Sequence, residues 1–163
     1  MALTVARTHT VIESPVGPLT LVATAGILSG IYMHQQRHRP PGDIFGESDE
    51  SPFTQTVDQL CEYFSGHRAE FSVPIAPIGT PFQRRVWAAL REVPYGHTVS
   101  YRQLADQIGQ PTAARAVGLA NGRNPISIII PCHRVLGSNG QLTGYGGGPE
   151  RKQQLLDFEH HRA

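Results

Sequence analysis

The sequence predicts an α+β protein of two small domains, one built around a sheet and the other mostly helical. Three short strand-like segments follow one another within the first 33 residues, whereas apolar residues after position 80 recur mainly at helical spacing. A proline-rich, extended segment at 73–79 separates the two patterns. We therefore expect an N-terminal structural domain over 1–77 and a C-terminal domain over 78–163.

The composition is that of a folded globular chain. Hydrophobic residues make up 39% of the 163 residues and charged residues 17%, which allows a buried core and argues against disorder. No apolar run is long enough to span a bilayer, and the first ten residues lack a signal segment. Two cysteines are too few for a disulfide framework. We expect a cytoplasmic protein that does not associate with membranes.

The N-terminal domain is expected to contain a three-stranded antiparallel sheet. Strands are predicted over 8–13, 19–23 and 27–33, and the turn-forming cluster 14–18 joins the first two. The acidic, proline-containing segment 35–52 predicts a surface loop. An amphipathic helix is expected over 53–65, with its apolar face formed by Val57, Leu60, Cys61 and Phe64. This pattern predicts that Cys61 is a core residue.

The C-terminal domain is expected to hold a winged-helix-like helix-turn-helix. Thr80 and Pro81 are typical of a helix start and predict a helix over 80–91. Ser100 and Gln103 form a capping-box pattern that begins a short helix, and a tight turn at Gly109 leads to another helix over about 112–120. A turn at 138–140, a glycine-rich loop at 143–148 and a final helix at 149–160 complete the domain.

Charge is distributed unevenly between the two halves. Residues 1–77 hold four arginines against eight acidic residues, whereas residues 78–163 hold nine arginines and one lysine against five acidic residues. A polyanion would therefore be drawn to the second half. The helix at 112–120 carries almost only small side chains and one cation, Arg115. Tight helix packing and close, sequence-independent contact with DNA both explain this pattern.

Cys132 is the candidate reactive residue. It lies in the run 129–135, belongs to no amphipathic stripe, follows Pro131 and precedes His133 and Arg134. Neighbouring cations lower the pKa of a thiol from about 8.5 into the range of about 3.5–7.5, and the thiolate is the nucleophile. A structural cysteine buried at a strand end is the alternative that the local sequence leaves open.

The motif Pro131-Cys132-His133-Arg134-Val135 resembles the acceptor site of the O6-alkylguanine-DNA alkyltransferases, also called methylated-DNA–protein-cysteine methyltransferases. Further motifs follow this family's order and spacing: Ser100-Tyr101, the run 113–118, Asn124-Pro125, Tyr145-Gly146-Gly147 and Glu159. The resemblance is detailed from about residue 80 onward. The N-terminal half matches in outline, through Ser-Pro-x-Gly-Pro-Leu at 14–19.

The resemblance implies a single-turnover DNA-repair reaction. Cys132 would take an alkyl group, such as methyl, from O6 of guanine, with O4 of thymine as a further candidate substrate. His133, oriented by Glu159, would accept the thiol proton through a water molecule. Tyr101 would rotate the nucleotide and hydrogen-bond the guanine ring, and Asn124 would fix the geometry of the site. This scheme implies a suicide methylated-DNA–[protein]-cysteine S-methyltransferase.

The resemblance also implies how DNA is bound. The helix-turn-helix would enter the minor groove of double-stranded DNA that contains alkylated bases, and Arg115 would fill the space of a flipped nucleotide. The base would enter a pocket walled by Tyr145, Gly146 and Gly147. Other expected DNA contacts are Ser100, Ala113, Ala114, Ala116, Gly118 and Arg134. We expect a monomer in solution, and cooperative assembly along DNA is left open.

No cofactor and no metal site are expected. His34 and His38 have a chelating spacing if helical, but no cysteine or acidic cluster accompanies them. Some members of the family hold zinc through N-terminal cysteines, whereas this chain has only Cys61 there. Three alternatives remain: a non-catalytic alkyltransferase-like protein that binds DNA lesions, a helix-turn-helix regulator, and a Cys-His hydrolase.

Overall fold

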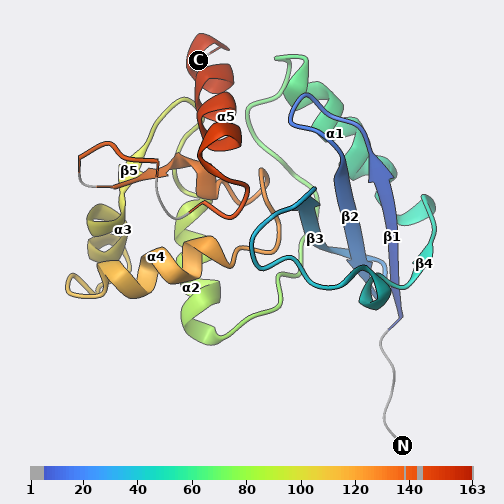
Figure 1. Ribbon diagram of the computed structural model, residues 1–163, viewed down its shortest axis with the longest axis horizontal. Coiled ribbons are helices and arrows are strands. Elements are labelled where there is room, and N and C mark those ends of the chain that lie inside the picture. Colours follow the sequence, from blue (N-terminus) through green and yellow to red (C-terminus); the bar gives the residue numbers. More distant parts are fainter. Residues whose placement is uncertain (1–5, 138, 143–144, 163) are drawn as a thin grey trace, which may run out of the picture.

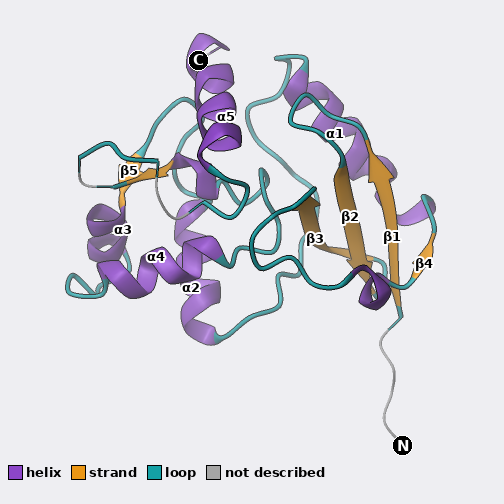
Figure 2. Ribbon diagram, viewed as in Figure 1, coloured by secondary structure: helices purple, strands orange, loops and turns teal. Residues whose placement is uncertain are grey.

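The computed structural model describes residues 6–137, 139–142 and 145–162. The N-terminal sheet and helix α1 form one half of the molecule, and helices α2 to α5 form the other (Figure 1). The long strands lie in the N-terminal half and the described α-helices, except α1, lie in the C-terminal half, which confirms the predicted α+β class (Figure 2). Ser138 of the predicted turn, and Thr143 and Gly144 of the predicted glycine-rich loop, lie outside the described residues.

The N-terminal sheet is an antiparallel meander with one added strand. Strands β1 (Arg7–Ile12), β2 (Leu19–Thr24) and β3 (Ile27–Met33) pair antiparallel, with β2 in the middle and almost fully buried. The three predicted strands are therefore confirmed. A two-residue strand, β4 (Glu47–Ser48), adds to the edge of β1 in parallel orientation, so the sheet has four strands among the described residues.

Strand β4 lies in the segment that was predicted to be a loop. This segment also contains the 3₁₀ turns η1 (Gly42–Phe45) and η2 (Ser51–Phe53). Gly46 has φ +77°, and a Cβ at this position would collide with the carbonyl group of Arg7. A glycine is thus needed for the chain to come this close to β1. Two polar residues cannot show a strand period, so the sequence pattern did not indicate β4.

Helix α1 (Thr54–Phe64) packs most of its predicted apolar face on the core, since Leu60 is buried and Val57 and Phe64 are half-buried against it. Its fully buried residues are Thr56, Gln59, Leu60 and Tyr63. Cys61 is exposed, so the prediction of a core cysteine is wrong. The Gln59 amide donates to the Ser72 hydroxyl at 2.7 Å and accepts from the Ser72 N–H at 2.9 Å. Because these bonds satisfy the polar side chain, Gln59 can extend the buried face on the side of the helix away from Cys61.

The C-terminal half contains the predicted helix-turn-helix. Helix α2 (Pro81–Leu90) and helix α3 (Tyr101–Gln107) both begin with complete capping boxes, at Thr80 and Ser100 respectively. Helix α4 (Ala114–Gly122) follows the turn at Gly109 and continues two residues beyond the predicted end. Trp87 in α2 donates its indole N–H to the Ala120 carbonyl at 2.9 Å, which ties α2 to α4.

Two short strands and a final helix close the domain. Strand β5 (Val99–Ser100) pairs in parallel with β6 (Val135–Leu136), which brings the start of α3 beside the end of the Cys132 motif. Helix α5 (Pro149–Arg162) follows the glycine-rich loop. Within the described chain, no helix has the length and apolar character needed to cross a membrane.

The segment before Cys132 packs along β3 and joins the two halves. The N–H of Ile31 donates to the Pro125 carbonyl at 2.9 Å, and the N–H of Ser127 donates to the Ile31 carbonyl at 3.3 Å. Residues from both halves contribute to one continuous hydrophobic core. The Cys132 segment is therefore held by the N-terminal sheet as well as by its own domain. The domain boundary after residue 77 stays a prediction.

Candidate active site

A tight turn places Cys132 at the start of the 3₁₀ helix η3 (Cys132–Arg134). The N–H of Cys132 donates to the Ile130 carbonyl at 2.8 Å, across Pro131 with φ −80° and ψ 64°. These values are typical of an inverse γ-turn, and the proline ring fixes φ in advance. The Cys132 side chain is only 3% exposed. The turn therefore holds the thiol inside the protein with little backbone freedom.

A second tight turn precedes the first, and Asn124 braces it. Ile128 has φ +75°, which is costly for a β-branched residue, and the Ile129 N–H donates to the Ser127 carbonyl at 2.9 Å. The Asn124 amide donates to the Ile130 carbonyl at 2.8 Å and accepts from the Ile126 N–H at 3.0 Å. Asn124 thus spans the strained turn, which supports the geometric role expected of it.

The pKa of the Cys132 thiol differs from the one that its sequence neighbours predict. Burial raises its pKa to about 11, although a hydrogen bond with Asn124 and the charge of Lys152 oppose this effect. The prediction that adjacent cations lower the pKa is wrong, because Arg134 is paired elsewhere and burial favours neutral His133. The resting site therefore holds a protonated thiol, which needs a base at the moment of reaction.

His133 is a suitable base. Its Nε2 lies 2.7 Å from Oε2 of Glu159, and the ring is completely buried. Burial lowers the pKa of His133, while the hydrogen bond and charge of Glu159 oppose this shift. A neutral ring that donates from Nε2 keeps its lone pair on Nδ1. Nδ1 has no hydrogen-bond partner among the described residues, so it can accept a proton.

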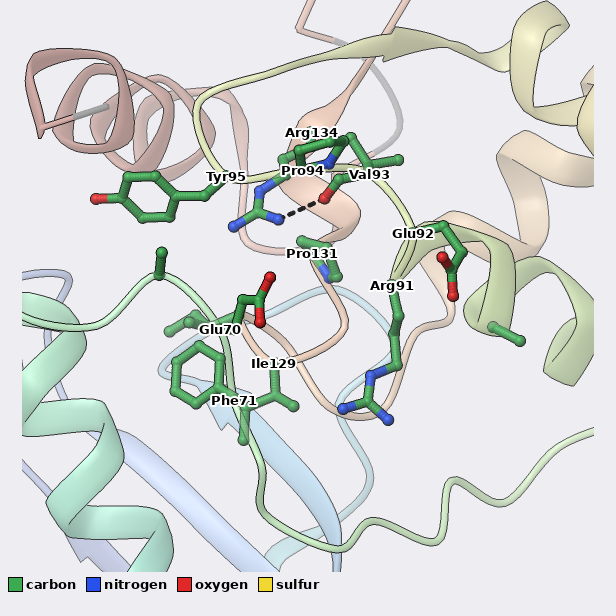
Figure 3. Close-up of a pocket in the computed structure, with 13 residues that line it drawn as sticks. Glu70, Phe71, Arg91, Glu92, Val93, Pro94, Tyr95, Ile129, Pro131 and Arg134 are labelled. Atoms are coloured by element: carbon green, nitrogen blue, oxygen red, sulfur yellow. Dashed lines mark hydrogen bonds between the residues drawn. The ribbon is translucent and has the colours of Figure 1, made fainter.

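Arg134 is buried and paired inside the protein, against the expectation that it contacts DNA. Its Nε donates to Oε1 of Glu159 at 2.8 Å, its Nη2 donates to Oε2 at 3.0 Å, and its Nη1 donates to the Val93 carbonyl at 2.7 Å. Figure 3 shows this guanidinium at the wall of a cavity, near Tyr95 and opposite the loop that carries Glu70 and Phe71. The sequence could not show that the motif's last cation points inward.

Glu159 is held as a carboxylate by several donors. Burial alone would raise its pKa, but hydrogen bonds and charges from His133 and Arg134 outweigh burial and hold the pKa well below the usual range. A further donor is Tyr63 of α1, whose Oη lies 2.6 Å from Oε2. Sequence reasoning found Glu159 but missed Tyr63, because the two residues are 96 positions apart.

Lys152 is a second residue that the sequence analysis missed. It was counted among the cations available to a polyanion, yet its side chain is fully buried. Burial lowers its pKa to about 8, and the nearby Cys132 opposes this shift. Its Nζ lies 5.9 Å from the centre of the Tyr101 ring. Its helical spacing with Leu155 and Glu159 was the available signal, since all three lie on the buried face of α5.

Tyr101 lies between the thiol and the helix-turn-helix. Burial raises its pKa to about 12, with Cys132 adding to the shift and a hydrogen bond with Asn121 opposing it, so the phenol keeps its proton at neutral pH. A Cβ added to Gly118 of α4 would meet the Tyr101 ring at 3.7 Å. Helix α4 therefore passes directly over this ring. The structure brings Tyr101, Cys132 and Lys152 together.

The Tyr145–Gly147 loop reaches from the C-terminal half to the end of β3. The Arg37 N–H donates to the Gly146 carbonyl at 2.8 Å, and Tyr145 Oη lies 3.7 Å from the Met33 sulfur. A Cβ at Gly147 would lie only 2.6 Å from the Tyr145 ring. These three loop residues line an open cavity together with Gln35, Arg37, Leu142, Gly148 and Pro149. The predicted pocket residues thus share one surface hollow.

The outer face of α4 is open to an incoming ligand. Arg115 and Ala116 are exposed, whereas Ala113, Ala114 and Gly118 are half-buried. Leu119, one turn after Arg115, is 70% exposed and was not singled out from the sequence. The Ser100 hydroxyl accepts the Gln103 N–H at 3.0 Å as a helix cap. The described residues contain no group of three or more His, Cys, Asp or Glu arranged for a metal ion.

Comparison with known families covers both halves of the chain. Residues 8–77 match the 6-O-methylguanine DNA methyltransferase ribonuclease-like domain, and residues 81–161 match the DNA binding domain of the same enzymes. A methylated-DNA–protein-cysteine methyltransferase of Mycobacterium bovis is 53% identical over 93% of this chain and 92% of its own length. One from Methanosarcina acetivorans is 46% identical over 93% of this chain and 97% of its own.

Solved structures show the same relationship. A crystal structure of Mycobacterium tuberculosis O6-methylguanine methyltransferase has a TM-score of 0.89 and 51% identity, covering 96% of this chain and 94% of that chain. The Mycobacterium tuberculosis OGT in complex with DNA has a TM-score of 0.88 and 52% identity over the same shares. The chain therefore belongs to the methylated-DNA–protein-cysteine methyltransferase family.

Proposed function

We propose that the protein repairs alkylated double-stranded DNA by transferring one alkyl group, such as methyl, from O6 of guanine to the sulfur of Cys132. The observation that carries this proposal is the buried set of Cys132, His133 and Glu159 beside Tyr101. A regulator that only binds DNA has no need of a base with a free Nδ1 beside a buried thiol. The names of the relatives support the same reaction.

The transfer is a displacement at the alkyl carbon. The sulfur–carbon bond forms as the bond between that carbon and O6 breaks, and the thiol proton passes to Nδ1 of His133, with a water molecule as relay. The departing guanine gains electron density, which a hydrogen bond donated by Tyr101 stabilises while the guanine ring takes up a proton. In the balance of the reaction, the proton that leaves Cys132 for His133 is released to water, and it replaces the proton that the guanine ring takes up. Asn124 keeps the sulfur in line during the transfer.

The DNA must deliver its base into the protein, because the thiol is buried. The alkyl carbon inside a duplex is out of reach, so the nucleotide leaves the stack and enters the hollow beside Tyr145, Gly146 and Gly147. We infer that α4 lies in the minor groove, where its small residues allow close approach and Arg115 fills the space left in the stack. Ser100, Ala113, Ala114, Ala116 and Gly118 would lie along this contact.

The chemistry also sets how the protein is used. The thioether formed on Cys132 has no good leaving group, so each molecule acts once. A thiol acceptor needs a reducing compartment that contains DNA, so we assign the protein to the cytoplasm. We also propose that it is a monomer in solution. O4 of thymine presents the same kind of O-alkyl carbon and is a second candidate substrate.

An intact-mass experiment tests the proposal. The protein is mixed with a duplex that carries O6-methylguanine, and the modified peptide is identified. We expect one added methyl on Cys132, none in Cys132→Ser, and an unchanged yield in Cys61→Ser, which removes the exposed thiol as a control. Tight lesion binding with an unmethylated protein would establish a non-catalytic binder. Many products per protein molecule would indicate a hydrolase.

A further inference from the structure

One hydrogen bond to the acceptor site comes from the N-terminal half. Tyr63 Oη donates to Oε2 of Glu159 at 2.6 Å, and the Tyr63 side chain is fully buried. Figure 1 shows the end of α1, which carries this residue, facing α5 across the junction of the two halves. The Tyr63 ring is wedged among other aromatic rings at centroid distances of 5.0–6.1 Å, those of Phe64, Phe71, Tyr95 and Phe158.

Tyr63 shares its acceptor atom with the candidate base. Oε2 of Glu159 lies 2.6 Å from Tyr63 Oη, 2.7 Å from His133 Nε2 and 3.0 Å from Arg134 Nη2. The pKa of Tyr63 is raised far above its usual range by burial and by the Glu159 charge, so its hydroxyl is always a donor. Any change in this hydrogen bond is therefore passed directly to the oxygen that holds His133.

We propose that Tyr63 is a positioning residue for alkyl transfer, acting through Glu159 to orient the His133 ring and to limit its basicity. This inference rests on the proposed function. It assigns a reaction role to a half of the chain that was expected to be mainly structural. The acceptor site is then complete only when α1 is docked against α5.

The proposed effect of Tyr63 on His133 follows from the sharing of one acceptor, Oε2 of Glu159, among three hydrogen-bond donors. Three donors now share Oε2, and charge-assisted hydrogen bonds of this kind are strong. Without the Tyr63 hydroxyl, the carboxylate pulls harder on the His133 N–H and is freer to rotate. The stronger pull on the N–H favours the imidazolium, which cannot accept the thiol proton. The freer rotation of the carboxylate lets the His133 ring turn, so that Nδ1 no longer points toward the proton it must accept. The first change slows transfer most at the acidic side of the pH profile, whereas the second slows transfer at every pH.

Other groups around His133 set the background against which this effect is measured. Glu159 favours the imidazolium, whereas Arg134 and Lys152 oppose it. Three further titratable groups face the same network, namely Cys132 from η3, Tyr95 from the loop after α2, and Tyr145 from the glycine-rich loop. A Tyr63→Phe change leaves all of these groups in place, so a change in the pH profile reports on the lost hydroxyl.

The test is single-turnover methyl transfer from an O6-methylguanine duplex, measured for wild type and Tyr63→Phe across pH 5–9. We expect the rate constant at neutral pH to fall on the order of tenfold, and the acidic limb of the profile to move to higher pH. DNA affinity, measured separately, should not change. Tyr32→Phe is the matched control, since Tyr32 lies in the same half and stacks on Phe45, and it should behave as wild type.

A second readout separates this proposal from the proposed function. The His133 ring nitrogens are titrated by NMR in the DNA-free protein, where Tyr63→Phe should raise the pKa of His133. A wild-type protein that transfers no methyl overturns the proposed function. An unchanged His133 titration and an unchanged pH profile overturn the role of Tyr63. If Tyr63→Phe does not fold, site-specific 3-fluorotyrosine at position 63, a stronger donor, should move the His133 titration to lower pH, and no movement overturns the role.

Discussion

Arg134 donates hydrogen bonds to both carboxylate oxygens of Glu159 in the interior of the protein, from Nε to Oε1 at 2.8 Å and from Nη2 to Oε2 at 3.0 Å. The guanidinium and carboxylate charges are both buried away from water, so removing either one would leave the other as an uncompensated buried charge. The same carboxylate orients His133. The ion pair is therefore at once a structural link between η3 and α5 and the support of the candidate base.

Glu159→Gln should destabilise the protein by roughly 3–5 kcal/mol, because it leaves the Arg134 charge buried and unpaired. Urea unfolding followed by circular dichroism measures the loss. Glu62→Gln is the control, since Glu62 pairs with Arg68 at 3.2 Å on the surface and should contribute under about 1 kcal/mol. Equal losses in the two variants would contradict the buried-pair interpretation.

Stability should fall in acid in two steps. His133 and Glu159 both have pKa values lowered in the folded state, so at low pH the unfolded chain binds protons that the native state does not. The free energy of unfolding should therefore drop as pH falls below about 6.5, from His133, and again below about 4.5, from Glu159. His133→Gln should flatten the first step in urea unfolding, whereas His160→Gln, at an exposed position, should retain it.

The Cys132 thiol should react slowly with a small alkylating reagent at neutral pH. Its pKa of about 11 leaves little thiolate, so the rate of reaction with iodoacetamide should rise about tenfold per pH unit from pH 7 to 10. The Cys61→Ser variant isolates the Cys132 reaction for mass spectrometry. Adding Lys152→Met should slow the reaction further below about pH 8, where Lys152 carries the charge that lowers the thiol pKa. A pH-independent rate would show that the thiol is not the resting form.

Arg115→Ala should weaken binding to duplex DNA and impair methyl transfer. The side chain is exposed on α4, and its positive charge should release counterions when it enters the duplex, so its loss should reduce the slope of log affinity against log salt by about 1. Titrations at several salt concentrations measure both quantities. Arg7→Ala removes the same charge from the N-terminal half and should leave the slope unchanged. Unchanged affinity, slope and transfer rate for Arg115→Ala would contradict the placement of Arg115 in the duplex.

Two glycines near the site should respond differently to alanine. Gly118→Ala places a Cβ at 3.7 Å from the Tyr101 ring, an ordinary contact, and should raise helix stability by up to about 1 kcal/mol. Gly147→Ala places a Cβ 2.6 Å from the Tyr145 ring and 2.7 Å from the Met33 sulfur, so one must move, costing about 1–3 kcal/mol. The two variants are compared by thermal unfolding and by their transfer rates. A Gly147→Ala variant more stable than wild type would contradict the predicted collision with Tyr145 and Met33.

The sequence predicted the local features well. The bounds of β3, the helix start at Thr80 and the capping box at Ser100 agree with the structure, because each depends on residues close together in the chain. The order of motifs around Cys132 also indicated the family. These signals need no knowledge of how the two halves pack.

The errors share one cause, which is tertiary contact. Cys61 faces outward while a hydrogen-bonded Gln59 extends the inner face of α1, and hydrophobic periodicity does not register a satisfied polar residue. The charges of Arg134 and Lys152 predict surface positions, but both side chains are buried, and charge alone does not reveal burial. The raised pKa of the thiol has the same origin, since burial outweighs neighbours along the chain.

The brace formed by Asn124 constrains evolution of the chain as well as its geometry. Seven residues separate Asn124 from Cys132, and Asn124 holds them through hydrogen bonds to Ile126 and Ile130. The apolar side chains within this interval can exchange for one another with modest cost, but one inserted or deleted residue would carry the sulfur away from its base. The number of residues between Asn124 and Cys132, more than their identity, should therefore be invariant among proteins that perform this transfer.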